Sequence, residues 1–377
     1  MNHPRVANIV LNNFTNDNRV YKTSRTLRDV GMEVEIVALL KGDVPEFDQS
    51  DGIPVRRIRI RSMALPEGLI WGGIKYLEII ARIVLGYRKM DVWHCNDFEI
   101  FFMGVLAKMT NPSLKLVYDS HEYQSERYGK HPLEKVFIRS MERWFIHRTE
   151  AFITVSEGIA HEYTKRFKVA NPVVVYNSPH RVEVTPNTLL RDQFAIPEDA
   201  IIFLYQGGLA VSRGIELLLE TFERMNDPNL HLVLMGSGTH EGLCAKAAER
   251  CDSIHLRPPV PYHELIQYTA SADIGVISTQ NLCLNNWFCM PNKLFEYIQA
   301  GVPVLCNDLH DCRLIIERYS LGEIIPEYQT DALEATARSM ASMELQSYQA
   351  GLKKAKDDFN WQSEEPKLRK IYQRFIC

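Results

Sequence analysis

Short runs of apolar residues alternate along the chain with longer segments whose apolar residues repeat at helical spacing. In the N-terminal half, the runs that predict strands are Val6–Leu11, Val34–Leu40, Val55–Arg61, Asp91–His94, Lys115–Asp119, Ala151–Val155 and Val173–Tyr176. Strands that alternate with helices in this way form parallel sheets, because each crossover helix returns the chain to the same edge. The pattern predicts an α/β fold with a doubly wound sheet in this half.

The same alternation restarts after a proline-rich segment. Residues 177–200 hold three prolines and few apolar runs, so we expect a linker there. Later strands are predicted at Ile201–Tyr205, Leu230–Met235, Ser253–Leu256, Asp273–Ile277 and Val302–Cys306. Because 377 residues suffice for two domains of ordinary size, the pattern predicts a second doubly wound domain.

One segment near residue 290 combines a helix start with charged side chains. Within Cys289–Cys306, Pro291 suits a first helical position and Gly301 ends the helix. A helix N-terminus attracts phosphate through its unpaired N–H groups, and Lys293 adds a full positive charge. Glu296, one turn later, could accept two hydrogen bonds from a ribose diol. From composition alone, a surface helix with a scattered Lys and Glu is the simpler interpretation.

Two glycine-containing turns follow predicted strands in the C-terminal half. In Tyr205–Gly214, the glycines between a strand and a helix allow backbone N–H groups to approach an anion. Arg213 in this segment could make a forked contact to two phosphate oxygens. Met235–Gly238 follows the next strand. Taken alone, each of these segments is equally consistent with a tight turn; the loop at residues 12–18, after the first strand, lacks the GxGxxG dinucleotide fingerprint.

Polar residues also follow the predicted strands of the N-terminal half. Asp97 and His121 each come just after a strand, and residues 12–18 form a polar loop after the first strand. Because the carboxyl ends of parallel strands share one edge, we expect these residues at the same edge of the sheet. Residues 124–131 predict a mobile polar loop, and a helix is predicted at 133–147.

Charge is unevenly distributed between the two halves. Residues 1–185 carry 26 Lys and Arg against 22 Asp and Glu, whereas the remainder carries 17 against 25. A basic first half suits an anionic partner, such as a membrane surface or a phosphorylated acceptor. Leu69–Met90 is apolar with four bases and one acid. It is either a core helix with basic ends or an amphipathic surface that docks on anionic lipid.

The eight cysteines include no CxxC pair, which indicates reduced thiols and a cytoplasmic setting. The N-terminus does not resemble a signal peptide, since Val6–Leu11 is too short and lacks a cleavage site. No segment is apolar over enough residues to span a bilayer.

Pro291-Asn-Lys-Leu-Phe-Glu-Tyr297, followed by Ala300-Gly-Val-Pro-Val304, resembles the nucleotide-binding signature of the retaining family 4 glycosyltransferases. The resemblance implies the GT-B architecture, in which two Rossmann-like domains face each other across a cleft. It places an acceptor-binding domain at 1–180, with a C-terminal helix at 360–377 that crosses back to it. A nucleotide-sugar-binding domain is then expected at 181–359.

The resemblance also implies roles for individual residues. Those that would contact the nucleotide-sugar donor are Gly207, Gly208, Arg213, Gly236, Val260, Asn292, Lys293, Leu294 and Glu296. Those with a catalytic role would be His121, Glu122, Arg213 and Lys293, with Glu122 either orienting His121 or binding an acceptor hydroxyl. Those on the acceptor side of the cleft would be Asn16, Arg19 and Asp97. The sequence contains no DxD motif, so we expect no metal ion, and no cofactor besides the nucleotide-sugar co-substrate.

Two positions depart from the family's pattern. The family often carries Arg directly after the first glycine of its loop, where this chain has Gly208. An earlier Glu, eight residues before Glu296, is replaced by Phe288, so a carboxylate that would touch the transferred sugar is missing. Backbone N–H groups of residues 289–292 are expected to do part of its work.

Together these features predict a retaining hexosyltransferase that moves a sugar from a UDP- or GDP-linked donor to a glycan or lipid-linked acceptor. Such an enzyme would act in cell-surface polysaccharide biosynthesis, in the cytoplasm or peripherally on the inner face of the membrane, with no nucleic-acid partner. Two alternatives stay open. One is a nucleotide-sugar 2-epimerase of the same architecture, and the other is a nucleotide-sugar-binding protein without turnover.

Overall fold

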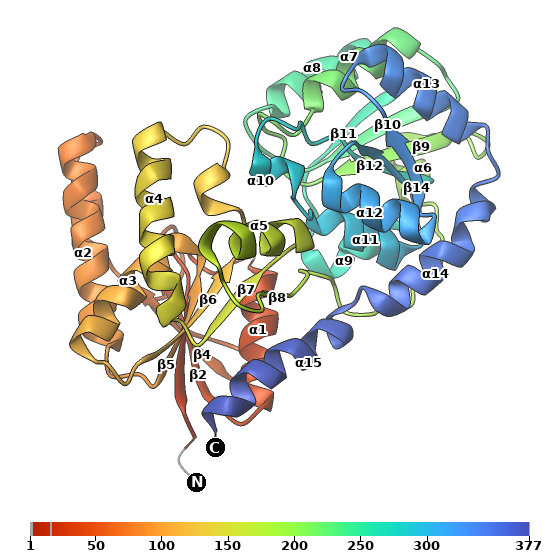
Figure 1. Ribbon diagram of the computed structural model, residues 1–377. Helices are drawn as coiled ribbons and strands as arrows, with labels where there is room; N and C mark the ends of the chain where they lie inside the picture. The colour runs from red at the N-terminus through yellow and green to blue at the C-terminus, as the bar shows by residue number, and fades with distance from the viewer. Residues whose placement is uncertain (1–2, 16, 377) are drawn as a thin grey trace. The chain divides into compact units, whose positions relative to one another are not determined.

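The computed structural model describes residues 3–15 and 17–376, and it divides into two compact units (Figure 1). Unit 1 comprises Met1–Val175 and Glu365–Cys377, and unit 2 comprises Tyr176–Glu364. The sequence places these boundaries at residues 180 and 359. Both units are α/β folds built on parallel sheets, and the C-terminal helix α15 (Trp361–Tyr372) ends within unit 1.

Unit 1 contains an eight-stranded sheet in the order β3-β4-β2-β1-β5-β6-β7-β8. Its strands are β1 (Arg5–Ile9), β2 (Glu33–Leu39), β3 (Phe47–Ser50), β4 (Ile53–Ile58), β5 (Val92–Asn96), β6 (Lys115–Ser120), β7 (Ala151–Thr154) and β8 (Val173–Val174). All neighbours pair in parallel except β3 and β4. The chain turns from β1 to opposite sides of the sheet, so β1 and β5 flank the switch point at which such folds bind ligands.

Strand β3 was not expected from the sequence, because its exposed residues form no apolar run. It pairs antiparallel with β4 through a two-residue turn at Asp51 and Gly52, both of which have positive φ (48° and 76°). An Asp-Gly pair favours this hairpin turn because its central residues need left-handed backbone angles. The dipeptide was therefore an available signal for the hairpin.

The helices of unit 1 cover both faces of this sheet (Figure 1). They are α1 (Asn18–Asp29), α2 (Leu69–Tyr87), α3 (Asp97–Thr110), α4 (Pro132–Phe145) and α5 (Glu157–Phe167), with 3₁₀ turns at η1 (Arg61–Ala64), η2 (Gln124–Glu126), η3 (Ile146–Arg148) and η5 (Gln373–Phe375). The helix predicted at 133–147 is α4 followed by η3.

The prediction of a mobile loop at 124–131 is wrong for its first part. Residues Gln124–Glu126 form the buried turn η2, and Glu126 accepts hydrogen bonds from Arg139 (2.6 Å) and Arg166 (2.5 Å). Polarity alone suggested exposure, but two long-range ion pairs allow this carboxylate to be buried.

Unit 2 contains a six-stranded, fully parallel sheet in the order β11-β10-β9-β12-β13-β14. Its strands are β9 (Ile201–Gln206), β10 (Leu230–Met235), β11 (Ile254–Arg257), β12 (Ile274–Ile277), β13 (Val304–Asn307) and β14 (Gly322–Ile325). The chain leaves β9 toward β10 and later returns to β12 on its other side. The crevice of this switch point therefore lies at the carboxyl ends of β9 and β12.

The helices of unit 2 are α6 (Leu189–Phe194), α7 (Ile215–Met225), α8 (Glu241–Arg250), α9 (Tyr262–Thr269), α10 (Leu284–Trp287), α11 (Asn292–Ala300), α12 (His310–Tyr319), α13 (Thr330–Ala341) and α14 (Gln349–Asp358), with η4 at Leu345–Tyr348. The expected linker contains α6. Strand β14 was missed because it is short and begins at Gly322, where a Cβ atom would lie 1.9 Å from the Val304 carbonyl oxygen. Among the described residues, no helix is long and apolar enough to cross a membrane.

The core of unit 1 contains a fully buried carboxyl group on α4. Glu142 of α4 is fully buried, and its Oε1 atom accepts hydrogen bonds from the hydroxyls of Tyr118 (2.9 Å) and Tyr163 (2.6 Å). Burial raises the pKa of Glu142 to about 7, although both hydroxyls favour the ionised form.

We expect the substitution Glu142→Gln to change how stability depends on pH. The folded state of the wild type holds a proton that the unfolded chain has lost, so its free energy of unfolding falls from the ordinary pKa of Glu up to about pH 7. The decline is about 1.4 kcal/mol per pH unit and is absent in the glutamine variant. Urea unfolding at several pH values measures this difference. The exposed Glu134→Gln is the control, and an equal pH profile for wild type and Glu142→Gln would refute the expectation.

Candidate functional site

In unit 2, two glycine turns meet at the carboxyl edge of the sheet. Gly207 follows β9 with φ of 119°, and its N–H donates to the Met235 carbonyl (2.9 Å). A Cβ atom on Gly236 would lie 1.8 Å from the Gly207 carbonyl oxygen. The two turns therefore pack backbone against backbone, which only glycine allows. The predicted donor residues Gly207 and Gly236 lie together at this edge.

The glycine loop is also fixed to the loop that follows β12. Gly214 has φ of 75°, and a Cβ atom there would lie 1.9 Å from the Ser278 carbonyl oxygen. The Ser278 hydroxyl donates to the Arg213 carbonyl (2.7 Å), and Gln280 N–H donates to the Ser212 carbonyl (2.9 Å). These bonds hold the backbone of Arg213 while its side chain is exposed.

Lys293 points at the glycine loop. Its Nζ atom lies 3.5 Å from the centroid of the Tyr205 ring, and 3.7 Å from where a Cβ atom on Gly207 would stand. The Tyr205 hydroxyl in turn donates to the Gly208 carbonyl (2.8 Å). Burial and the positive charge of Arg213 lower the pKa of Lys293 to about 7. The two predicted cations, Lys293 and Arg213, are therefore close enough beside the glycines for their charges to interact.

The carboxylate of Glu296 lies at the end of β9. Gln206 Nε2 donates to its Oε2 atom (2.5 Å), and Gln206 Oε1 accepts a hydrogen bond from the Thr269 hydroxyl (2.9 Å). Glu296 is almost fully buried, so this network fixes its orientation. Sequence reasoning missed Gln206 and Thr269, although Gln206 directly precedes the first glycine.

Helix α11, which carries Lys293 and Glu296, is held against the sheet by Tyr297. The Tyr297 hydroxyl donates to the Leu204 carbonyl (2.8 Å), and its ring packs on Gly275, where a Cβ atom would lie 2.5 Å away. The helix begins at Asn292, with Pro291 as its N-cap rather than its first residue.

The remaining predicted donor residues differ in their exposure. Leu294 is fully buried in the core, so any contact with a ligand would come from its backbone. Asn292 is exposed, and its Oδ1 accepts a hydrogen bond from Asn177 (3.1 Å). Val260 is half-buried in the loop that follows β11. Close by, burial and the charge of Glu296 raise the pKa of Tyr262, a residue that sequence reasoning missed.

Phe288 occupies the position of the missing acid. Its ring packs edge-on against the His310 ring, with centroids 5.3 Å apart. The Cys289 N–H donates to the Asn286 carbonyl (3.2 Å). The Cys289 amide is therefore already used within its own loop, and the expectation that the amides of residues 289–292 do part of the work of the missing carboxylate stays a prediction.

In unit 1, His121 lies between two carboxylates. Its Nδ1 atom is 3.6 Å from Asp97 Oδ2, and its Nε2 atom is 3.5 Å from Asp119 Oδ2. Asp97 also accepts hydrogen bonds from the His121 N–H (3.1 Å) and from Gln124 (2.6 Å). Although burial opposes it, the two carboxylates raise the pKa of His121. The predicted pair of Asp97 and His121 does meet at the sheet edge.

Asp119 links His121 to a buried network. Arg19 donates to both carboxylate oxygens of Asp119 (2.9 and 2.6 Å) and to the Val175 carbonyl (2.8 Å). His94 Nε2 lies 3.2 Å from Asp119, and His94 Nδ1 lies 2.6 Å from the Tyr372 hydroxyl. Burial raises the pKa of Asp119, but Arg19 and His121 outweigh it and hold that pKa well below its usual range.

This network changes the expected roles of two predicted residues. Arg19 is only 4% exposed, so contact with a bound anion would require breaking its pair with Asp119. Glu122 pairs with Arg127, and it is Asp97 and Asp119 that orient His121. Asn16 lies outside the described residues.

Sequence reasoning also missed three members of the network. Asp119 had a signal, because it ends the predicted strand Lys115–Asp119, two residues before His121. His94 lies inside a strand and Tyr372 near the chain end, and neither position carries a local signal.

Two family models match most of the chain. Residues 17–178 match Glycosyltransferase Family 4, and residues 186–358 match Glycosyl transferases group 1. An uncharacterized glycosyltransferase, MJ1607 of Methanocaldococcus jannaschii, is 26% identical, and the match covers 76% of this chain and 75% of that protein. Two proteins of Bacillus subtilis are each 23% identical. These are the putative glycosyltransferase EpsD (79% of this chain, 77% of that protein) and the putative teichuronic acid biosynthesis glycosyltransferase TuaC (79% and 74%).

Solved structures share the fold over the whole chain. Sucrose-phosphate synthase from Thermosynechococcus elongatus superposes with a TM-score of 0.80 at 15% identity, covering 99% of each chain. Anabaena Alr3699/HepE in complex with UDP-glucose superposes with a TM-score of 0.76 at 13% identity, covering 99% of this chain and 100% of that chain. At these identities the likeness concerns the fold.

The geometry around His121 predicts the effect of removing one carboxylate. The substitution Asp97→Asn should lower the pKa of His121 by about one pH unit or more, because an opposite charge within about 4 Å stabilises the imidazolium. NMR titration of the histidine rings measures this, with the His121 signal assigned from His121→Gln. Asp91→Asn, which removes an exposed carboxylate paired with Arg5, is the control. An unchanged titration of His121 in Asp97→Asn would contradict the assignment.

Proposed function

The chain belongs to the family 4 glycosyltransferases of the GT-B architecture, and on this basis we propose that it is a retaining hexosyltransferase using a UDP- or GDP-linked sugar. The observation that carries the proposal lies within unit 2. The glycine turn at Gly207, the amine of Lys293 and the carboxylate of Glu296 converge at the carboxyl edge of one sheet. This combination provides partners for both the diphosphate and the ribose of a nucleotide.

On the donor side, charge and backbone polarity complement a diphosphate. The amine of Lys293, the guanidinium of Arg213 and the N-terminus of α11 present positive charge beside the glycine loop. Glu296, fixed by Gln206, would accept hydrogen bonds from the ribose hydroxyls. The proposal needs no metal, because these groups can balance the charge of the diphosphate.

The proposed reaction breaks the bond between the sugar's anomeric carbon and the donor phosphate oxygen. Negative charge then grows on the departing nucleoside diphosphate, where Lys293 and Arg213 would stabilise it. The acceptor hydroxyl attacks the same face of the sugar, and its proton passes to a phosphate oxygen of the leaving group. His121, held between Asp97 and Asp119, would donate a hydrogen bond to the transferred sugar.

A glycan or lipid-linked acceptor in cell-surface polysaccharide biosynthesis is the acceptor class that we propose. The excess of basic residues in the first half supports an anionic acceptor or an anionic membrane surface as partner. The relative TuaC is named as a putative teichuronic acid biosynthesis glycosyltransferase. We place the enzyme in the cytoplasm, peripherally on the inner face of the membrane, and we expect no nucleic-acid partner.

Calorimetric titration with UDP and GDP tests the donor site. One nucleotide should bind, and Glu296→Ala should weaken that binding about ten-fold or more, because it removes charged acceptors of hydrogen bonds. Glu264→Ala, which removes a partly exposed carboxylate on α9, is the matched control. If neither nucleotide bound the wild type, the site would not function as proposed. If a nucleotide bound but no transfer or donor hydrolysis followed with any acceptor, the non-catalytic alternative would replace this proposal.

The lowered pKa of Lys293 predicts a pH dependence of donor binding. The bound diphosphate raises this pKa, so binding above about pH 7 takes up a proton and the affinity falls about ten-fold per pH unit. Below about pH 7 the amine is charged in both states, so it adds no pH dependence. Calorimetry with the nucleotide-sugar across this range measures both regimes. Lys293→Met should bind more weakly and without the decline above pH 7, and persistence of the decline in that variant would refute this role.

A further inference from the structure

Two histidines of unit 1 approach the same oxygen atom of Asp119. His94 Nε2 lies 3.2 Å from Asp119 Oδ2, and His121 Nε2 lies 3.5 Å from that same atom. Arg19 Nε also donates to Oδ2, at 2.9 Å. At 3.5 Å the contact of His121 is longer than an ordinary hydrogen bond between nitrogen and oxygen. Among the described residues, His121 Nε2 is a buried polar atom without a hydrogen bond of ordinary geometry.

His94 is a neutral imidazole whose ring proton has one possible place. Its side chain is fully buried, and burial lowers its pKa although the charge of Asp119 favours protonation. Asp119 stays ionised, because Arg19 and His121 outweigh the effect of burial and hold its pKa well below the usual range. A carboxylate only accepts hydrogen bonds, so His94 Nε2 carries the ring proton and donates it to Asp119. His94 Nδ1 is then an acceptor.

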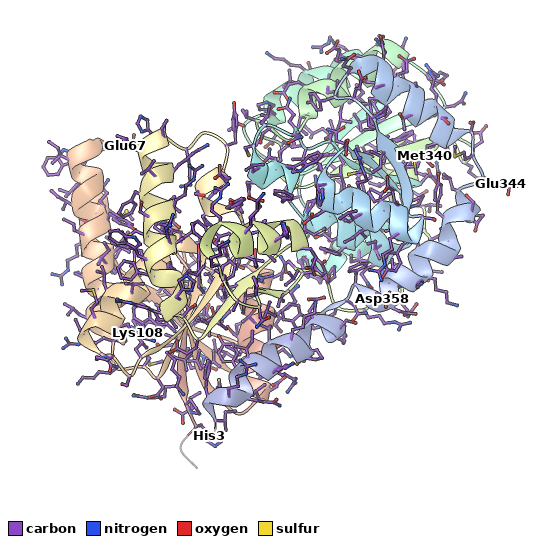
Figure 2. The ribbon with its side chains drawn as sticks, in the orientation of Figure 1. His3, Glu67, Lys108, Met340, Glu344 and Asp358 are labelled. Atoms are coloured by element: carbon purple, nitrogen blue, oxygen red, sulfur yellow. The ribbon has the colours of Figure 1, made fainter. Side chains whose placement is uncertain are left out.

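The hydroxyl of Tyr372 supplies the donor that His94 Nδ1 requires. Tyr372 is the last residue of α15, which follows the labelled Asp358 in Figure 2. Its hydroxyl oxygen lies 2.6 Å from His94 Nδ1, and its side chain is fully buried. Burial and the charge of Asp119 hold the pKa of this hydroxyl well above its usual range, so it keeps its proton. Donation to Nδ1 polarises the ring and makes Nε2–H a stronger donor, because hydrogen bonds in a chain strengthen one another.

The charge of His121 depends on three ionised groups from three elements. Asp97 of α3 and Asp119 of β6 attract the imidazolium, with Asp97 Oδ2 3.6 Å from His121 Nδ1. The guanidinium of Arg19 on α1 repels it, as burial also disfavours its charge. The hydrogen bond from His94 offsets part of the charge of Asp119, and so weakens the attraction of Asp119 for His121. His94 therefore influences a ring that it does not touch.

We propose that His94 is a positioning residue for His121, acting through the carboxylate of Asp119. Its hydrogen bond, oriented by Tyr372, occupies Oδ2, so His121 is held near Asp119 without closing a hydrogen bond to it. The imidazole thereby keeps an N–H that it can donate to the transferred sugar. This inference deepens the proposed function, and it rests on that function for the identity of the ligand. A purely structural His94 would stabilise the fold and leave the ionisation of His121 unchanged.

NMR titration of the histidine rings in the full-length protein tests this assignment. In the double variant His94→Leu/Tyr372→Phe, Asp119 loses one donor, so the pKa of His121 should rise by about one pH unit. The N–H of His121 should also become protected from exchange with water, because it closes onto Asp119. The double change removes both partners of the bond between His94 and Tyr372, so no unpaired polar atom remains at that bond. Tyr372→Phe alone should raise the pKa about half as much, because it weakens the donor without removing it.

Two further variants serve as rescue and control. His94→Gln should titrate as the wild type does, because its amide offers both an acceptor and a donor in place of the ring nitrogens. His231→Leu/Tyr319→Phe removes a buried histidine and a buried tyrosine hydroxyl from unit 2, and it should leave the titration of His121 unchanged.

An unchanged titration of His121 in the double variant and in Tyr372→Phe would overturn the assignment, as would a lowered pKa or an equal rise in the unit 2 control. If the double variant does not fold, Tyr372→Phe and His94→Gln decide by the same criteria. Calorimetric titration of the wild type with UDP and GDP separates the two hypotheses. Nucleotide binding together with an unchanged titration would refute only the positioning role, and a shifted titration without nucleotide binding would refute only the proposed function.

Discussion

The polar edge of unit 1 depends on one buried carboxylate. Asp119 is fully buried, and an unpaired charge in such a place would cost several kcal/mol. The guanidinium of Arg19, itself buried, contacts both of its oxygens. The pair of Arg19 and Asp119 connects α1 to β6. His94 contacts both Asp119 and Tyr372, so it extends the network to the C-terminal helix α15. His121 lies at the partly buried end of this network, where Asp97 and Asp119 raise its pKa.

In unit 2, close backbone packing rather than a buried ion pair holds the candidate site in place. Close packing of backbone at Gly207, Gly214 and Gly236 leaves no room for side chains, so the loops around β9 hold one conformation. The positive charges of Lys293 and Arg213, beside these loops, are not neutralised by a carboxylate to the degree that Arg19 neutralises Asp119 in unit 1. The low pKa of Lys293 is the consequence, since burial and Arg213 both disfavour its charge. An incoming diphosphate would relieve that cost, so the site is pre-organised for an anion.

Unit 2 thus contains charged groups whose arrangement is costly in the isolated protein. Lys293 and Arg213 carry like charges, and their repulsion adds to the cost of burying the Lys293 amine. Such features are retained in proteins where a partner compensates them. An anionic donor would offset this cost.

The alternation of apolar runs and amphipathic segments determined the two parallel sheets, because a strand buried on both faces needs a continuous apolar run. Local motifs located Gly207, Lys293 and Glu296, since a turn or a helix start is encoded by adjacent residues. Only the tertiary structure decided that Arg19 is buried against Asp119, that Asp97 and Asp119 rather than Glu122 flank His121, and that Tyr372 reaches His94. These partners are far apart in the chain or share an edge that only folding creates. Periodicity likewise showed that α2 is apolar, but which of its stripes is covered depends on where α3 packs, and no local pattern contains that information.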